Sequence, residues 1–313
     1  MYKPLISALT PTYNRENLIR RAIDSVLTQT YSNIELVIVD NCSTDSTEEI
    51  IKSYKDDRIR YIKLDKNYGH IVSRNRCIEE VKGEYFAFCD SDDEWLPEFI
   101  EKLYNKFIEL NDEKVGAIYT EYMIHDDIGH EKILMNKTMP TGNVYEKLLT
   151  SFTPSGFTNF LFKTSAFKSI GLLDPKASGF DDHDALLRLA RNYHFETVHE
   201  PLMIRHEHGS SQIAKDITFR YDHIKNFLEL WGDEMIRVGG KENYINYRNK
   251  RIFSITKNTI KNPPQNYRKI FGKLFKNLSI TGLNRPGLFF QSIIIFLVGP
   301  RLFKRMKKRE NLE

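Results

Sequence analysis

Cysteine is scarce in this chain of 313 residues, which contains only Cys42, Cys77 and Cys89. Their number is odd and no two of them form a CxxC pair, which excludes a disulfide framework and a cysteine-based zinc site. Reduced thiols are therefore expected, as is usual in the cytosol. Long apolar segments are missing as well. The longest, residues 288–298, is interrupted by two polar residues and is too short for a membrane-spanning helix.

Motifs of several common enzyme classes are also absent. The chain has no GxxxxGK[ST] loop, which excludes a P-loop nucleotidase, and no GxGxxG after its first apolar segment, which excludes the Rossmann dinucleotide fingerprint. HExxH and GxSxG are also missing, so the chain lacks the common signatures of metalloproteases and esterases. The apolar stretch near the N-terminus has only five residues, too few for a signal peptide. We therefore expect a cytoplasmic protein.

Charge is present but unevenly distributed. Residues 1–240 carry 29 Lys and Arg against 39 Asp and Glu, a net charge of −10, whereas residues 241–313 carry 17 against 3, a net charge of +14. An acidic body with a basic tail indicates an anionic surface as a partner of the tail. Nucleic acid is not the expected partner, because the body is acidic and lacks a known binding module.

The basic tail has a second feature, an apolar stretch of about a dozen residues within 283–309. It is followed by Arg301, Lys304, Arg305, Lys307, Lys308 and Arg309. Apolar and aromatic residues flanked by basic ones are typical of a segment that lies in the interface of an anionic membrane. The alternative is a C-terminal helix that packs on the body and ends in a solvated charged segment. Peripheral attachment to a membrane is the preferred interpretation.

Strand and helix signals alternate along the first 120 residues or so. Apolar runs predict strands at residues 5–9, 36–39, 60–64 and 85–89. Apolar stripes of helical spacing predict helices at residues 18–27, 73–81 and 181–191, the first with Asn14 as a candidate N-cap. This alternation predicts an α/β fold with a doubly wound, mostly parallel sheet flanked by helices. After about residue 220 the chain reads as a helical, basic C-terminal extension.

Polar residues gather where the predicted strands end. Thr10–Arg15 follow the first strand, Asp40 and Asn41 the second, and Asp90–Asp93 the fourth. The carboxyl ends of parallel strands meet at one sheet edge, where ligands of such folds bind. Asp90–Asp93 suits Mg²⁺ or Mn²⁺ and the phosphates that these ions hold, with a solvated turn as the alternative. The Asp40 carboxylate is suited to accept a hydrogen bond from a nucleotide base or a ribose, and the alternative is that it caps a helix or a turn.

Two later groups of polar residues can take part in binding or catalysis only if the fold brings them to that edge of the sheet. Asp181, Asp182 and Asp184 begin a predicted helix, where carboxylates either stabilise the helix dipole or serve as a general base. His206 and His208 are candidates for contact with a metal or a phosphate, although a lone histidine is usually structural.

Taken together and in this order, the motifs resemble those of family 2 glycosyltransferases, which have the GT-A fold. The resemblance spans roughly residues 3–215. The matching segments are Pro11–Arg15, Ile23–Tyr31, Glu35–Asp45, Asn67–Gly69, Arg74–Asn75, Asp90–Asp93, Gly171–Asp174 and Asp181–Leu189. It implies a GT-A domain over residues 1–220, with a nucleotide-binding half to about 115 and an acceptor-binding half from about 116. Residues 221–313 then form the membrane-associating region.

The resemblance also implies a role for each matching residue. The residues expected around the nucleotide are Pro11, Thr12, Tyr13, Asn14, Arg15, Asp40, Asn67, Arg74, Asp90 and Ser91. Asp92 is expected to bind the divalent metal together with His208, which fits the pattern best because Ser211 follows it; His206 is the alternative. The residues expected to contact the acceptor, or to support the side chains that bind nucleotide and metal, are Asp181, Asp93 and His206. Asp181 stands where the family has Glu.

Asp182 is the implied catalytic base, and it would work best if burial or its acidic neighbours raise its pKa. The expected reaction is an inverting hexosyl transfer from a nucleoside-diphosphate sugar, with UDP as the nucleotide. The expected acceptor is a glycan or lipid-linked oligosaccharide of surface polysaccharide or glycoconjugate synthesis, at the cytoplasmic face of the cell membrane. Two alternatives remain. One is a sugar-1-phosphate nucleotidyltransferase, although that class of enzyme has a Gly-rich loop after its first strand, where this chain has Pro11–Arg15. The other is a catalytically inactive membrane-associated binding module.

Overall fold

A computed structural model gives the fold and describes residues 2–127, 132–135, 140–152, 154, 156–207 and 217–261. Side chains of residues 132–135, 217–220 and 253–261 lie outside this description. So do His208 and the tail for which membrane contact is predicted. The chain divides into two compact units, residues 1–148 with 152–210, and residues 149–151 with 211–313. The predicted domain boundary near residue 220 stays a prediction.

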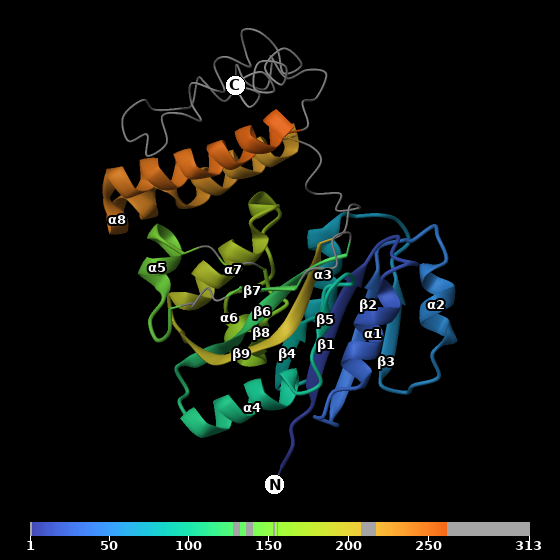
Figure 1. The fold of residues 1–313 in the computed structure, drawn as a ribbon. Coiled ribbons are helices and arrows are strands. Elements are labelled where there is room, and N and C mark those ends of the chain that lie inside the picture. Colours follow the sequence, from blue (N-terminus) through green and yellow to red (C-terminus); the bar gives the residue numbers. More distant parts are fainter. Residues whose placement is uncertain are drawn as a thin grey trace, which may run out of the picture. The chain divides into compact units, whose positions relative to one another are not determined.

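The first unit is built on one mixed sheet with the strand order β3-β2-β1-β4-β8-β6-β9-β5, and β7 pairs with β6 (Figure 1). Its N-terminal part is parallel and consists of β1 (Ile6–Thr12), β2 (Ile34–Asp40), β3 (Ile59–Lys63) and β4 (Tyr85–Phe88). The remaining strands are β5 (Glu94–Trp95), β6 (Val115–Asp126), β7 (Lys132–Met135), β8 (Phe160–Lys163) and β9 (His194–Glu207). The predicted parallel α/β sheet is thus confirmed, with antiparallel strands added to it.

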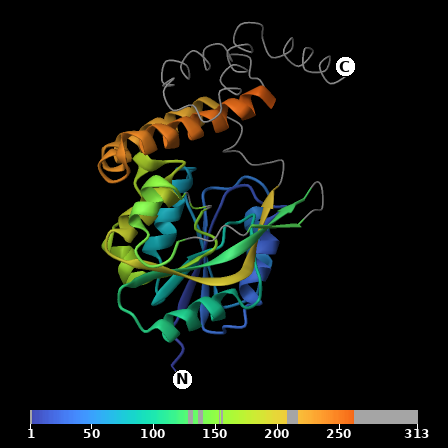
Figure 2. The same ribbon diagram turned by 60° about the vertical axis from the view of Figure 1, so that its left-hand side comes forward.

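Helices cover both faces of this sheet (Figure 2). They are α1 (Ile19–Leu27), α2 (Thr47–Ser53), α3 (His70–Glu79), α4 (Phe99–Leu110), α6 (Thr164–Ser169), the 3₁₀ turn Pro175–Ala177 and α7 (Asp181–Ala190). The short helix α5 (Tyr145–Thr150) spans the point where the two units divide. Every residue of β2 is buried, as expected for a parallel strand with helices on both sides.

The sheet has an apolar core on each side. On one face, Ile6 and Ala8 of β1 pack with α1 and α4 in a continuous cluster. On the other, α3 packs against β1 and β2, and Phe86 of β4 contacts Phe167 of α6 edge to face at 5.0 Å. Alternation of side chains along a strand explains this division, because successive residues point to opposite faces. The two cores together hold the carboxyl edge of the sheet rigidly.

One glycine is required where the chain turns into β4. A Cβ on Gly83 would lie 2.6 Å from the carbonyl oxygen of Leu5 and 2.8 Å from the backbone nitrogen of Ser7. The Gly83 N–H donates to Ser7 Oγ at 2.9 Å, and Ser7 Oγ donates to Glu35 Oε1 at 2.6 Å. Any larger residue would push the start of β4 away from β1.

Strands β6 and β9 form the long central pair of the second half of the sheet. They run parallel from Val115 opposite His194 to Asp126 opposite Glu207, with register shifts between Val115 and Ala117 and near Glu121. His125 lies opposite His206 in this register. These two histidines, distant in sequence, are therefore neighbours at the ends of adjacent strands.

The first predicted helix begins later than its candidate cap suggests. Helix α1 starts at Ile19 after Leu18, and Asn14 has a left-handed backbone with φ of 51°. The backbone N–H of Asn14 donates to Ser43 Oγ at 2.9 Å, and its side-chain oxygen accepts from the Thr44 N–H at 2.9 Å. The N-cap prediction is therefore wrong, because Asn14 instead joins the loop after β1 to the loop after β2.

The second unit contains α8 (Ile217–Lys261), which is interrupted at Gly240 by a non-helical backbone with φ of 80°. The chain reverses there, and its two helical arms lie side by side (Figure 1). The rings of Phe227 and Tyr247 are 6.3 Å apart, and a Cβ on Gly232 would lie 3.1 Å from the ring of Tyr244. Within the described part of the chain, no helix has both the length and the hydropathy needed to cross a membrane.

Candidate functional site

The loops after β1, β2 and β4 meet at the carboxyl edge of the sheet, as the sequence predicts. Arg15 follows β1, and its backbone N–H donates to Thr47 Oγ1 at 2.7 Å. Its guanidinium lies 3.6 Å from the carboxylate of Asp92, which follows β4. A cation from the loop after β1 therefore faces an anion from the loop after β4.

Thr12 ends β1 and carries an unusual hydroxyl. The residue is buried, 4% exposed, and its Oγ1 has no hydrogen-bond partner among the residues that the structure describes. A buried hydroxyl without a partner costs free energy unless a ligand or water supplies the bond. Thr12 is one of the residues for which a nucleotide contact is predicted, and Pro11 precedes it on the same strand.

The carboxylate of Asp40, at the end of β2, is completely buried. Its Oδ1 accepts from the backbone N–H and the hydroxyl of Ser43, at 2.8 and 2.6 Å. Its Oδ2 accepts from the hydroxyl of Tyr61 at 2.7 Å. Burial, followed by this bond to Asp40, raises the pKa of Tyr61, so the phenol remains a donor. Asp40 thus holds the turn after β2, and its contact with a nucleotide base stays a prediction.

A pair of asparagines positions the segment before α3. The side-chain amide of Asn41 donates to Asn67 Oδ1 at 2.8 Å, and its own oxygen accepts from the Tyr68 N–H at 2.9 Å. Asn67 Oδ1 also accepts from the N–H of Gly69, whose φ of 88° suits glycine. Asn67, one of the predicted nucleotide residues, is thereby tied to the end of β2.

The acidic loop, Asp90–Asp93, links β4 to β5. Ser91 and Asp93 are buried, and the Asp93 N–H donates to the Asp90 carbonyl at 3.0 Å. Burial, and then the charges of Asp90 and Asp92, raise the pKa of Asp93 well above its ordinary value. Three carboxylates thus lie within four residues of a partly buried loop, and oxygen ligands of this kind suit a divalent cation.

Thr158 and Trp95 support this loop from the second half of the sheet. The hydroxyl of Thr158 donates to Asp90 Oδ2 at 3.2 Å, and the indole N–H of Trp95 donates to the Thr158 carbonyl at 2.9 Å. Trp95 stacks on Phe99 with ring centroids 4.4 Å apart. Neither Thr158 nor Trp95 stands out in the sequence, because only the folded chain brings them next to Asp90.

Arg74, on α3, is the centre of the site. Its Nη1 donates to Asp181 Oδ2 at 2.8 Å and to Asp182 Oδ1 at 2.7 Å, while its Nη2 lies 3.2 Å from both oxygens of Asp90. Its side chain is 13% exposed. One guanidinium therefore joins Asp90 to the consecutive residues Asp181 and Asp182, which are distant from it in sequence. The predicted contact of Arg74 itself with the nucleotide stays a prediction.

The surroundings of Arg74 keep it charged. Burial opposes the charge, but the carboxylates of Asp182, Asp90 and Asp181 raise its pKa well above the ordinary value. The guanidinium also lies 5.8 Å from the ring centroids of Phe88 and Phe157. Aromatic faces favour a cation at this distance, so these two rings stabilise the guanidinium as well.

The two carboxylates at the start of α7 have opposite pKa shifts. Burial, and then the charges of Asp181 and Asp90, raise the pKa of Asp182 to about 7. Asp181 is held well below its usual pKa, against the effect of burial, by Arg74 and by His70, whose Nε2 lies 3.3 Å from Asp181 Oδ1. Neighbouring groups with separated pKa values are a hallmark of assigned acid–base roles. The pKa of Asp182 is thus raised in the direction that favours a base, and its catalytic role stays a prediction.

One oxygen of Asp182 remains approachable. Oδ1 is bonded to Arg74, whereas a Cβ built on Gly156 would lie 3.6 Å from Oδ2. Gly156 itself thus places no side chain beside Oδ2, and the Asp182 side chain is 24% exposed. The geometry allows a hydroxyl group to reach the carboxylate from this side.

The two histidines with a predicted role near the metal have different outcomes. His208 lies outside the described residues. The imidazole of His206 is 6% exposed, with Nδ1 at 2.7 Å from Asp127 Oδ1 and Nε2 at 3.2 Å from Glu94 Oε2. The backbone N–H of His206 donates to Asp93 Oδ1 at 3.3 Å, which joins the end of β9 to the acidic loop.

Known proteins resemble this chain in sequence and in fold. Residues 7–171 match the family model "Glycosyl transferase family 2". An uncharacterised glycosyltransferase of Rickettsia typhi, RT0329, is 31% identical over 253 residues, which are 76% of this chain and 76% of that protein. A Bacillus subtilis protein named for teichuronic acid biosynthesis, TuaG, is 44% identical over 103 residues. That match covers 32% of this chain and less than half, 41%, of TuaG.

Solved structures show the same fold at low sequence identity. Residues 1–349 of TarS from S. aureus, in complex with UDP-GlcNAc, match with a TM-score of 0.66 at 16% identity, covering 97% of this chain and 92% of that one. The mannosyltransferase PcManGT from Pyrobaculum calidifontis, in complex with GDP-Man and Mn²⁺, matches with a TM-score of 0.59 at 16% identity, covering 96% and 87%. The predicted GT-A fold is confirmed by this likeness.

Proposed function

The chain belongs to glycosyl transferase family 2, and from this premise we propose that it is an inverting enzyme that uses a nucleoside-diphosphate sugar, with UDP as the nucleotide. The acceptor is a hydroxyl of a glycan or lipid-linked oligosaccharide. The observation that carries the proposal is the pair Asp181 and Asp182, in which one carboxylate stays ionised and the other has a pKa near 7. A base of that pKa works best near neutral pH.

The chain's own residues account for the transfer step. An acceptor hydroxyl oxygen attacks the anomeric carbon of the donor sugar and forms the new glycosidic bond, while Asp182 takes the hydroxyl proton. The bond from the anomeric carbon to the diphosphate breaks, and its electron pair leaves with the diphosphate oxygen. One displacement from the face opposite the leaving group inverts the anomeric centre, as in inverting glycosidases with a sugar hydroxyl in place of water.

Arg74 aligns the two sides of this reaction. It bonds Asp182 on α7 and Asp90 in the acidic loop at the same time, so the base is held at a set position relative to the donor side. The buried hydroxyl of Thr12, which has no partner within the described part of the chain, and the guanidinium of Arg15 are suited to the nucleotide and its phosphates. Positioning of this kind supplies a large part of the rate of a displacement.

The acidic loop fits a divalent ion such as Mn²⁺ or Mg²⁺. Its three carboxylates supply the hard oxygen ligands that these ions take. Asp92 would hold the ion, with His208 as the predicted second ligand. When bound, the ion would stabilise the negative charge that develops on the departing diphosphate.

Asp182→Asn tests the proposed base. A panel of nucleotide sugars identifies a donor by thermal stabilisation, and release of nucleoside diphosphate then measures turnover. The variant should lose about 10²–10⁴-fold in turnover, because that is the usual contribution of a general base. It should still be stabilised by the donor. Asp174→Asn, which keeps a side chain able to cap the turn at Pro175, is the matched control. Unchanged turnover in folded Asp182→Asn protein would remove Asp182 from the mechanism.

The metal role has its own test. Chelation with EDTA should abolish turnover, and added Mn²⁺ or Mg²⁺ should restore it in the wild type but not in Asp92→Asn. Turnover that is indifferent to EDTA would refute the role of Asp92. The comparison is made on a donor already found with the nucleotide-sugar panel.

The cellular setting extends the proposal. The relative named for teichuronic acid biosynthesis supports surface polysaccharide or glycoconjugate synthesis as the process. The basic, apolar tail supports peripheral attachment to the cytoplasmic face of the cell membrane, beside a lipid-linked acceptor. Flotation with anionic liposomes of the full chain against residues 1–280 tests the attachment. Equal flotation of the two proteins would reject it.

A further inference from the structure

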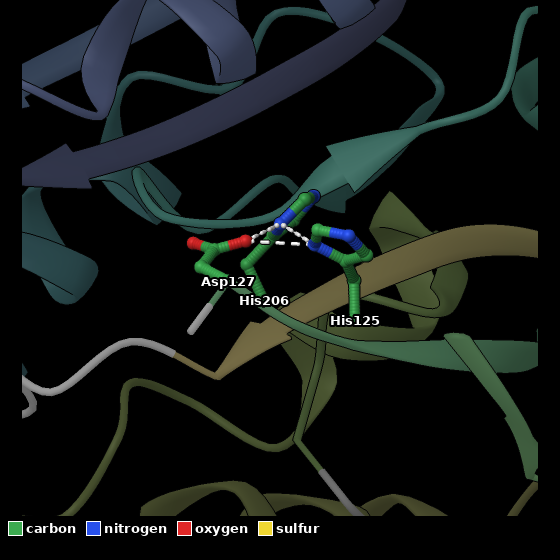
Figure 3. Close-up of side chains that lie close together, drawn as sticks. All are labelled: His125, Asp127 and His206. Atoms are coloured by element: carbon green, nitrogen blue, oxygen red, sulfur yellow. Dashed lines mark hydrogen bonds and ion pairs between the residues drawn. The ribbon is translucent and has the colours of Figure 1, made fainter. Parts of the chain in front are cut away.

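Beside the acidic loop lies a second group of polar side chains, the His–Asp cluster, which consists of His125, Asp127 and His206 (Figure 3). The Nδ1 atoms of both histidines converge on Asp127 Oδ1, at 2.8 Å from His125 and 2.7 Å from His206. The two Nδ1 atoms are 3.3 Å apart. The three side chains thus aim one ligand atom each at a common point.

The backbone holds this arrangement firmly. His125 and His206 occupy opposite positions of the paired strands β6 and β9, and Asp127 follows two residues after His125. Residues two apart on an extended chain point to the same side. The Asp127 N–H donates to the Glu207 carbonyl at 3.1 Å and extends the pairing to the end of the cluster. Ligands on paired strands need little ordering when an ion binds.

Hydrogen bonding satisfies both carboxylates beside His206 only if its imidazole is protonated. A neutral imidazole carries a single N–H, and an ionised carboxylate only accepts. His206 faces a carboxylate on each side, with Asp127 at Nδ1 and Glu94 at Nε2, at 2.7 and 3.2 Å. Neutral His206 can therefore satisfy only one of them. A metal ion at Nδ1 resolves the conflict, because the Nδ1 lone pair then binds the ion and the Nε2–H donates to Glu94.

That resolved arrangement is the usual one for a metal-bound histidine, whose second nitrogen donates to a carboxylate. The distances agree with it. For bonds of about 2.0–2.1 Å at tetrahedral angles, two ligand atoms lie about 3.3 Å apart, which is the separation of the two Nδ1 atoms. The carboxylate oxygen needs to move back by about half an ångström, which a small rotation of the half-buried Asp127 side chain provides.

We propose that His125, Asp127 and His206 bind a divalent transition-metal ion of the Zn²⁺ class, at a site separate from the ion expected at Asp92. Two imidazoles and one carboxylate suit Zn²⁺, whereas the all-oxygen acidic loop suits Mg²⁺ or Mn²⁺. Arg21 separates the two positions: its Nη2 donates to the Asp92 carbonyl at 2.7 Å, and its Nη1 lies 3.6 Å from Asp127 Oδ2. Asp127 Oδ1 remains turned toward the histidines.

The bound ion clamps the end of β6 to the end of β9. Through the His206 N–H and Glu94 it also secures the end of the acidic loop next to β5, since Asp93 accepts from that N–H and Glu94 follows Asp93 directly. The ion is thus structural, and its occupancy stiffens the region from which Asp92 projects.

The test uses the full chain without an affinity tag, stripped with a chelator and dialysed. Zn²⁺ is titrated by calorimetry and Co²⁺ by its visible absorption, which reports nitrogen and oxygen ligands in a tetrahedral field. We expect about one ion per chain in the wild type. His125→Gln and Asp127→Asn should weaken Zn²⁺ binding more than tenfold, and Glu94→Gln by about 10–100-fold, the usual effect of losing the carboxylate behind a metal-bound histidine.

Two controls make the result decisive. His199→Gln removes an exposed histidine of the same strand β9 and should leave Zn²⁺ binding unchanged. Asp92→Asn should also retain the tight Zn²⁺ site, because that residue is outside the cluster. Absence of Zn²⁺ and Co²⁺ binding in the wild type would overturn the proposal, as would binding lost in Asp92→Asn but kept in His125→Gln. Circular dichroism of each stripped variant verifies its fold, and Glu94→Gln decides the matter if His125→Gln does not fold.

Discussion

The acid–base pair at the start of α7 gives the sharpest prediction. Replacing Asp181 by Asn removes one negative charge beside Asp182 and keeps the shape of the side chain. The charge of Asp181 is one of the causes that raise the pKa of Asp182 to about 7. Its removal also leaves Arg74 with one fewer carboxylate to pair with. Both effects lower the pKa of Asp182.

The structure sets the size of the shift. Asp181 Oδ2 and Asp182 Oδ1 are bonded to the same Arg74 nitrogen at 2.8 and 2.7 Å, so these oxygens are at most about 5.5 Å apart. At an effective dielectric constant of about 20, two unit charges at that distance repel by roughly 3 kcal/mol. Each pKa unit corresponds to about 1.4 kcal/mol, so this repulsion is worth about two units before screening, and the Arg74 charge between the two carboxylates reduces it to between about one and two.

The assay is the pH dependence of kcat/KM for nucleoside-diphosphate release, which reports the free enzyme. A base must be ionised to act, so activity falls as the pH drops through its pKa. In the wild type the acidic limb should have its midpoint near pH 7 and fall about tenfold per pH unit below it. In Asp181→Asn the midpoint should move to lower pH by about one to two units.

The reasoning has a clear point of failure. An acidic limb that stays in place in Asp181→Asn, or moves to higher pH, would show that Asp182 is not the titrating base. Asp174→Asn serves as the control, since its charge is not among the causes of the Asp182 shift. The midpoint of the acidic limb in Asp174→Asn should stay near pH 7.

Three further predictions concern stability and are measured by urea unfolding at pH 7.5. Arg74→Gln leaves three carboxylates without their common cation and should lower the free energy of unfolding by about 3–5 kcal/mol; a loss below 1 kcal/mol would contradict the central role of this guanidinium. Gly83→Ala forces a Cβ to within 2.6 Å of the Leu5 carbonyl and should cost more than about 3 kcal/mol, so a neutral effect would exclude this close approach. Tyr61→Phe removes the bond to the buried Asp40 carboxylate and should cost about 1.5–3 kcal/mol, whereas an unchanged midpoint would mean that Asp40 does not depend on it.

Much of the first half of the fold is predictable because its signals are local. The four-residue apolar run in β2 and the apolar stripe of α1 specify a buried parallel strand and a covering helix, and both occur close to the predicted positions. Polar residues after these strands then fall at one edge by topology. The loops after β1, β2 and β4 were placed together by this reasoning.

The rest depends on contacts between distant segments. The long pair β6 and β9 reads irregularly in sequence because its register shifts and its outer residues are partly exposed. Arg74 is predicted to line the nucleotide, yet its partners in the structure include Asp182, and no local pattern reveals such a bridge. The His–Asp cluster is likewise invisible in sequence, since His125 meets His206 only through strand pairing.

The chain's two tryptophans, Trp95 and Trp231, fall one in each compact unit, and both are buried. Indole emission responds to local polarity and packing. A Trp231→Phe variant would leave Trp95 as the single tryptophan, and two hydrogen bonds connect Trp95 to Asp90 through Thr158. Its emission would follow events at the acidic loop, and the reciprocal Trp95→Phe variant would follow the helical arms of α8. The molecule therefore carries a native optical label for each unit, by which their unfolding can be timed separately.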